Sequence, residues 1–197
     1  MLVDRVPIAV FASGSGSNLQ VILDAERHED DWPARVVLVV SDRPESMAVK
    51  RAQRRQVPVF ARSPRDYSDK TAFELDVLNA LREAGVAYIA LAGYMRIIGP
   101  VLLEAYQDKV LNVHPSLLPA FPGRHAVKDA LAAGVTETGV TVHLVDQGID
   151  TGPVLAQRVV RVDAGMAEDQ LLARVHAVEH QLYPYVIRRF LTGQPME

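Results

Sequence analysis

The sequence contains no cysteine in its 197 residues. This absence excludes disulfides, thiolate metal sites and cysteine nucleophiles, and it fits a reducing compartment. Long apolar runs are also lacking: the longest have the length of strands, and the run near the start is too short for a signal peptide or a membrane span. We therefore expect a cytoplasmic protein with no membrane partner.

An excess of one charge is missing as well. The chain has 21 Lys and Arg residues against 24 Asp and Glu residues, and its formal net charge is -3. Such a balance gives no electrostatic reason to bind a nucleic acid backbone. Hydrophobic residues make up 49% of the chain, which is ordinary for a globular protein. The length fits one domain, and we expect it to span residues 1–197.

Apolar runs of strand length alternate with segments of helical periodicity. Strands are predicted over residues 6–12, 36–40, 57–60, 88–92 and 110–114, and helices from residue 19 and over 47–56, 67–84 and 101–106. This alternation predicts an α/β fold, Rossmann-like, with a mostly parallel sheet covered by helices on both faces. Two further strands, 139–145 and 154–162, predict an antiparallel C-terminal addition, and residues 167–191 predict a closing helix.

A glycine-rich turn follows the first strand. Gly14 and Gly16 let the backbone approach a ligand closely, and Ser17 and Asn18 add donors where the next helix begins. The turn suits a phosphate monoester. Leu19 stands where a dinucleotide-binding fingerprint needs its third glycine, so dinucleotide binding is disfavoured. A plain strand-to-helix turn with a helix cap is the alternative.

Two polar residues occupy the end of the strand over residues 110–114. Asn112 and His114 are two apart and therefore point to the same side. An amide beside an imidazole can hydrogen-bond an oxyanion as a carbonyl becomes tetrahedral. Asp150, in a glycine-rich loop, could return a carboxylate to His114, raise its pKa and favour its protonated form. The spacing alone leaves structural roles for His114 and Asp150 open.

The segment from His176 to His180 matches H-x-x-E-H, a zinc-protease signature. Both histidines share a helix face, so they could bind a metal. Such short patterns also match by chance, and few residues remain downstream for a further ligand. We expect a helix of the last layer and no metal site.

Several segments together resemble the folate-dependent phosphoribosylglycinamide formyltransferases of purine synthesis. They run in family order through nearly the whole chain: residues 12–20 (ASGSGSNLQ), 91–97 (LAGYMRI), 111–119 (LNVHPSLLP), 121–126 (FPGRHA), 150–154 (DTGPV) and 179–184 (EHQLYP). N-x-H-P-S-L-L-P followed by D-x-G-P-V is specific for formyltetrahydrofolate enzymes. The resemblance implies the formyltransferase fold and formyl transfer from 10-formyltetrahydrofolate, without a metal, to the amine of phosphoribosylglycinamide.

The resemblance also implies roles for individual residues. The catalytic residues are Asn112, His114 and Asp150. The residues that meet the ribonucleotide are Gly16, Ser17, Asn18 and Glu179. Those that meet the folate are Lys70, Met95, Arg96, Ile97, Ile98, Asn112, Asp146, Gln147, Gly148 and Ile149. Lys70 replaces an expected arginine near the folate tail, which keeps the charge and loses the fork geometry; Arg65 is the alternative for this contact.

Other activities remain possible at this point. Formyltetrahydrofolate deformylases and methionyl-tRNA formyltransferases share the core. In the deformylases this core is expected with an additional regulatory domain, and in the methionyl-tRNA enzymes with an additional RNA-binding domain. Sugar-nucleotide formyltransferases are expected to differ in the phosphate loop. A folate- or phosphate-binding module without catalysis is the non-enzymatic alternative. We expect small-molecule substrates as partners, no nucleic acid, and a monomer or homodimer.

Overall fold

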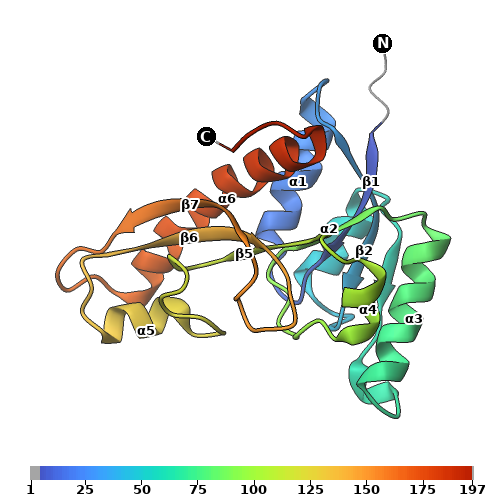
Figure 1. Ribbon diagram of the computed structural model, residues 1–197, viewed down its shortest axis with the longest axis horizontal. Coiled ribbons are helices and arrows are strands. Elements are labelled where there is room, and N and C mark those ends of the chain that lie inside the picture. The colour runs from blue at the N-terminus through green and yellow to red at the C-terminus, as the bar shows by residue number, and fades with distance from the viewer. Residues whose placement is uncertain (1–4, 197) are drawn as a thin grey trace. The chain divides into compact units, whose positions relative to one another are not determined.

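The computed structural model describes residues 5–196, which form two compact units. The first unit ends at Leu111 and the second begins at Asn112. The fold is α/β, as predicted, with a run of parallel strands followed by an antiparallel pair near the C-terminus (Figure 1).

The first unit alternates strands and helices. Its elements are β1 (Val6–Phe11), α1 (Ser17–His28), β2 (Ala34–Ser41), α2 (Met47–Arg54), β3 (Val59–Ala61), the 3-10 helix η1 (Pro64–Asp66), α3 (Lys70–Glu83), β4 (Tyr88–Leu91) and α4 (Pro100–Ala105). The strands are parallel and lie in the order β3-β2-β1-β4. The order reverses between β1 and β4, and such a switch point is where open α/β sheets place ligands.

The core of the first unit lies on both sides of β1. Residues Ala9, Val10 and Phe11 are fully buried, because a parallel strand between two others has helices over both faces. The helices α1 and α2 contact each other, as do α3 and α4 (Figure 1). The loops at the carboxyl ends of β1, β2 and β4 therefore extend from a closely packed core.

Two helix predictions differ from the structure. The helix expected from residue 67 begins at Lys70, because Asp69 caps it by accepting the backbone N–H of Ala72 at 2.8 Å. The helix α5 (Ala126–Ala132) was not predicted. It has seven residues, too few for its apolar positions to establish a period.

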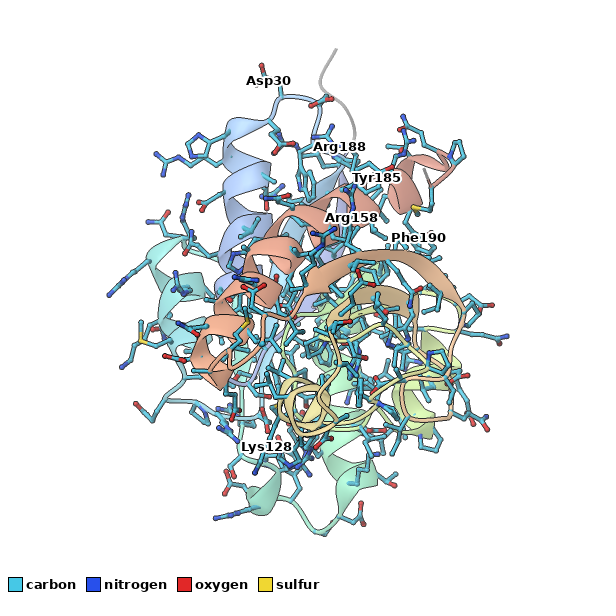
Figure 2. All side chains as sticks on the ribbon, turned by 90° about the vertical axis from the view of Figure 1, so that its left-hand side faces the viewer. Asp30, Lys128, Arg158, Tyr185, Arg188 and Phe190 are labelled. Carbon is cyan, nitrogen blue, oxygen red and sulfur yellow. The ribbon has the colours of Figure 1, made fainter. Side chains whose placement is uncertain are left out.

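The second unit contains the end of β5 (Val110–His114), then α5, β6 (Glu137–Leu144), β7 (Val154–Arg161) and α6 (Glu168–Thr192). The strands β6 and β7 are antiparallel, as predicted, and their register shifts between Val142 and His143. The long helix α6 packs on both strands through residues three or four positions apart, among them Leu171, Val175, Leu182 and Val186. Its last turns carry Tyr185, Arg188 and Phe190 (Figure 2).

Candidate active site

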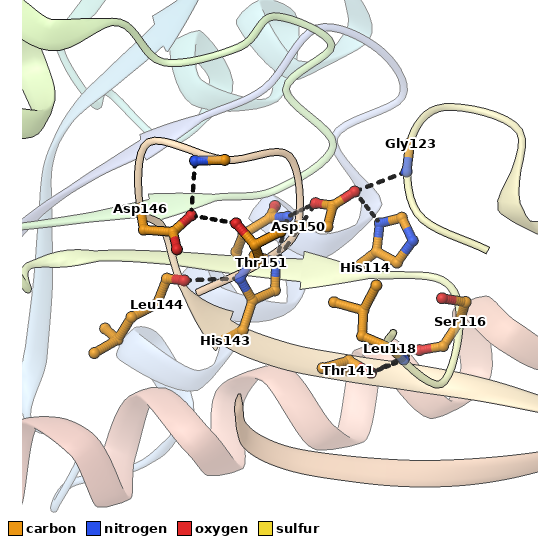
Figure 3. A network of polar contacts seen from close by, with 12 residues as sticks. His114, Ser116, Leu118, Gly123, Thr141, His143, Leu144, Asp146, Asp150 and Thr151 are labelled. Atoms are coloured by element: carbon orange, nitrogen blue, oxygen red, sulfur yellow. Dashed lines mark hydrogen bonds and ion pairs between the residues drawn. The ribbon is translucent and has the colours of Figure 1, made fainter. Parts of the chain in front are cut away.

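The three residues predicted to be catalytic lie together in the second unit. Asn112 and His114 belong to the end of β5. Asp150 comes from the loop that joins β6 to β7 and lies beside His114 (Figure 3). The Oδ2 atom of Asp150 is 3.4 Å from Nδ1 of His114, and its Oδ1 atom is 3.5 Å from Nδ2 of Asn112. The side chain of His114 is only 5% exposed and that of Asp150 13% exposed, so water screens this pair weakly.

The loop before Asp150 is shaped to return its carboxylate to β5. Asp146 accepts hydrogen bonds from the backbone of Gly148 at 2.9 Å and from the hydroxyl of Thr151 at 2.7 Å. A side chain at Gly152 would lie 1.9 Å from the carbonyl oxygen of Leu144. Asp150 itself adopts a left-handed φ of 56°, which is uncommon outside glycine. The backbone therefore holds an unfavourable conformation at the residue that carries the charge.

His114 is placed between two hydrogen-bond acceptors. Its Nε2 atom is 2.9 Å from the carbonyl oxygen of Phe121, and its Nδ1 atom faces Asp150. A neutral imidazole has one N–H and can donate to only one of them, whereas an imidazolium donates to both. The surrounding acceptors thus match the protonated ring.

The expected rise in the pKa of His114 is wrong for the protein without substrates. Burial of the ring lowers its pKa below the ordinary value, and this effect outweighs the opposing effects of the Phe121 carbonyl and of Asp150. The neighbouring His143 lowers it further. His114 is therefore neutral near pH 7 in the protein without substrates. Asp150 and the Phe121 carbonyl are placed to accept hydrogen bonds from the ring once it gains a proton.

The carboxyl group of Asp150 has the opposite balance. Burial raises its pKa, but the nearby His143 ring and the backbone N–H of Gly123, which donates to Oδ2 at 2.8 Å, bring the pKa below the ordinary value. The two histidines lower it further. Asp150 is thus a fixed negative charge beside His114.

Sequence reasoning missed His143, which completes this cluster. Its Nε2 atom is 3.1 Å from Nδ2 of Asn112 and 3.6 Å from Oδ1 of Asp150, and its side chain is 2% exposed. Its Nδ1 atom lies 2.8 Å from the carbonyl oxygen of Leu144 and donates there, and its Nε2 atom faces both Asn112 and Asp150. The register shift of β6 occurs at this residue, and such irregularities often redirect side chains beside active sites. The available signal was a histidine near the end of the predicted strand over residues 139–145, just before the loop that carries Asp150.

The residues predicted to hold a phosphate lie where β1 leads into α1. Gly16 precedes the helix with a left-handed φ of 68°, and a Cβ there would lie 2.7 Å from the Cα of Ala48. Only glycine fits this position. Ser17 and Asn18 begin α1, where helix N–H groups attract anions.

The residues predicted to meet the folate have varied surroundings. Met95 and Ile97 are 44% and 55% exposed, whereas Ile98 is buried. Arg96 and the loop residues Asp146, Gln147 and Gly148 are exposed. Ile149 is 55% exposed. Exposed apolar side chains on ordered loops are typical of ligand sites.

Lys70 and Arg65, the two candidates for the folate tail, are both exposed. Lys70 begins α3, and its Nζ atom is 3.7 Å from Oε1 of Glu74, a carboxylate that also accepts the backbone N–H of Gly99 at 2.6 Å. Arg65 lies in η1. Glu179, predicted to meet the ribonucleotide, is 6% exposed within α6.

The H-x-x-E-H segment forms part of α6, as expected. The rings of His176 and His180 stack with their centroids 6.1 Å apart, and burial lowers the pKa of both. Within residues 5–196, no group of three His, Cys, Asp or Glu side chains is arranged to hold a metal ion. No helix in the described part of the chain is long and apolar enough to cross a membrane.

Comparison with known proteins places this chain in a family. Residues 6–187 match the family model of the formyl transferases. The phosphoribosylglycinamide formyltransferase of Bacillus subtilis is 47% identical over 183 residues, which cover 93% of each chain. The crystal structure of glycinamide ribonucleotide transformylase 1 from Geobacillus kaustophilus is 56% identical, with a TM-score of 0.92, and the match covers 95% of this chain and 99% of that one.

A much longer relative matches over the same region. The trifunctional purine biosynthetic protein adenosine-3 of Drosophila melanogaster is 37% identical over 190 residues, and this match covers 96% of the present chain but 14% of that protein. The present chain thus spans about one seventh of the trifunctional relative and nearly all of the Bacillus one.

Proposed function

The chain belongs to the formyl transferase family, and we propose that within it this protein transfers the formyl group of 10-formyltetrahydrofolate to the amine of phosphoribosylglycinamide. The observation that carries the proposal is the cluster of Asn112, His114 and Asp150, which combines an amide donor, a buried imidazole and a carboxylate within 3.5 Å of its partners. Its relatives named for the same activity support the choice of substrate.

The residues proposed to bind the two substrates suit them chemically. A glycine turn at a helix N-terminus suits the phosphate of the ribonucleotide. Exposed apolar side chains at Met95 and Ile97 suit a flat pterin ring. 10-Formyltetrahydrofolate supplies the formyl group; the remaining chemistry belongs to side chains of this protein.

Asn112 is proposed to stabilise the reaction electrostatically. As the substrate amine attacks the formyl carbon, negative charge develops on the formyl oxygen, and the Nδ2 amide of Asn112 donates a hydrogen bond to it. Contacts with His143 at 3.1 Å and with Oδ1 of Asp150 at 3.5 Å hold that amide in place, and the longer contact, with Asp150, is the one that the formyl oxygen replaces. A pre-oriented donor needs little rearrangement when the charge forms.

His114 is proposed to carry the proton. The attacking amine must lose a proton and the departing N10 must gain one. Neutral His114 accepts the first, becomes an imidazolium between Asp150 and the Phe121 carbonyl, and then donates a proton to N10. The pKa lowered by burial keeps the ring ready to accept, and the fixed charge of Asp150 stabilises the ring once it has done so.

The test follows 10-formyltetrahydrofolate with purified protein and a chelator, with and without phosphoribosylglycinamide. Release of tetrahydrofolate and formation of formylated ribonucleotide only when both substrates are present is the expected result. Release of free formate without the ribonucleotide would instead identify a deformylase. Binding of the folate with no turnover in either mixture would identify a binding module, and loss of turnover in the chelator would contradict the metal-free mechanism.

A further inference from the structure

Ser13 occupies the junction of three loops in the first unit. It follows β1, its side chain is buried, and neither the phosphate-binding nor the catalytic assignment uses it. Its Oγ atom lies 2.5 Å from Oδ1 of Asp42, in the loop after β2, and 2.9 Å from the backbone nitrogen of Met95, in the loop after β4. One hydroxyl thus meets the loops that follow three neighbouring strands.

The direction of both hydrogen bonds is fixed. An ionised carboxylate only accepts, so the Ser13 hydroxyl donates its single proton to Asp42. Its lone pairs are then turned to the N–H of Met95, which they accept. Asp42 therefore orients the hydroxyl that holds Met95.

The backbone of the same residue adds a second attachment. The N–H of Ser13 donates to the carbonyl oxygen of Gly93 at 3.1 Å, so Ser13 binds the turn of residues 93–95 both before and after Tyr94. The ring of Tyr94 packs edge-to-face on Phe11 of β1, with centroids 5.2 Å apart. The turn is thus fixed to the end of β1 by two hydrogen bonds and an aromatic contact.

The turn so held begins the segment proposed to line the folate site, and Ser13 also begins the loop proposed to hold the phosphate. The two loops leave β1 and β4 at the point where the strand order reverses. Because Ser13 bonds to Gly93 and Met95, a displacement of the loop after β1 at Ser13 also moves hydrogen-bond partners of the loop after β4. We infer that Ser13 is a positioning residue that couples the phosphate loop, residues 13–18, to the folate segment, residues 95–98, so that each substrate strengthens binding of the other.

This inference rests on the proposed function for the identity of the two ligands, whereas the attachment itself is independent of it. Coupling between two sites is reciprocal, so each ligand must raise the affinity for the other by the same factor, typically about 5-fold or more. The variant Ser13→Ala removes the hydroxyl that joins the loops. The matched control is Ser41→Ala, which removes another fully buried serine hydroxyl at the end of β2; among residues 5–196 this hydroxyl bonds to Arg43 and Ser46.

Two measurements test the coupling. Hydrogen exchange of the ligand-free protein should show faster exchange of the Met95 amide in Ser13→Ala and no change there in Ser41→Ala. Titration of phosphoribosylglycinamide with and without saturating 5-formyltetrahydrofolate, a stable analogue, should show cooperative binding in the parent protein and in Ser41→Ala, and a factor near one in Ser13→Ala.

Asp42 provides a second pair of variants. Asp42→Asn keeps an oxygen that accepts from Ser13 and should keep most of the coupling, whereas Asp42→Ala should lose it. Cooperative binding that survives in Ser13→Ala, or independent binding in the parent protein, would overturn the inference. If the parent protein bound neither ligand, the proposed function would fail instead, and unchanged exchange of the Met95 amide in Ser13→Ala would still refute the attachment.

Discussion

Replacing Asp150 by asparagine removes one charge and keeps the shape of the side chain. In the proposed mechanism His114 becomes an imidazolium in the transition state, and Oδ2 of Asp150, 3.4 Å from Nδ1, is its counter-charge. A hydrogen bond to a charged partner contributes about 1.5–3 kcal/mol, and the pair is shielded from water, so little of this is lost to screening. At 1.36 kcal/mol per tenfold change in rate, kcat should fall by about 10- to 150-fold.

The same substitution should move the pH dependence. The carboxylate of Asp150 raises the pKa of His114 against the larger effect of burial, so removing the charge lowers this pKa further. The neutral ring is the form that accepts the proton, and the rate rises as pH increases through its pKa. The rising limb of kcat against pH should therefore shift to lower pH in Asp150→Asn, even though the plateau is lower.

The assay is single-turnover formyl transfer from pH 5 to 9, with an NMR titration of the His114 ring beside it. Asp146→Asn is the matched control, because it makes the same chemical change in the same loop and its carboxylate bonds only to Gly148 and Thr151 in the described contacts. Asp146→Asn should leave the rising limb of kcat against pH at its original position, whatever its effect on KM. A lower plateau with an unmoved limb in Asp150→Asn would refute the electrostatic role and leave Asp150 as a shaper of the loop.

Three further predictions concern the site and its support. Asn112→Ala and His114→Ala should each lower kcat by about 10²–10³-fold, and near-normal single-turnover rates in either would remove that residue from the mechanism. Gly16→Ala should weaken ribonucleotide binding and lower the melting temperature more than Gly85→Ala, because both positions have left-handed φ but only Gly16 has backbone within 2.7 Å of the new methyl group; equal losses by calorimetry would contradict this. Burial raises the pKa of Glu74, so the folded state binds more protons than the unfolded one and stability falls as pH rises above the ordinary value of 4.5; Glu74→Gln should remove that decline, as measured by urea unfolding from pH 4 to 7.

The strands and the common side of Asn112 and His114 were predictable because their signals are local. The strand β5 has the bounds expected from its sequence, and the spacing of Asn112 and His114 fixes their common side. The glycine-rich loop suggested that Asp150 could return to His114, and the family resemblance favoured that choice, since nothing local tells where a loop ends. The start of α3 was missed because a cap, and not periodicity, decided it.

Two features of the site depend on long-range packing. The contacts of His143 with Asn112 and Asp150 follow from a register shift in β6, which no sequence pattern announced. The sign of the change in the pKa of His114 depends on how far burial outweighs Asp150, and burial at a strand end is set by loops distant in sequence. The contact partner of a residue is therefore easier to predict from sequence than the burial of its side chain.

The carbonyl of Phe121 imposes a condition on anything that binds to His114. This carbonyl oxygen accepts a hydrogen bond from Nε2 of His114 at 2.9 Å. Phe121 itself has a left-handed φ of 52°, which is unfavourable for a bulky residue. An incoming amine or oxyanion must therefore compete with the protein's own backbone, and its observed affinity reports a difference between two contacts. The loss of this hydrogen bond is therefore a cost that a substrate's own contacts with His114 must offset, and a substrate that makes no such contact leaves the ring with Phe121.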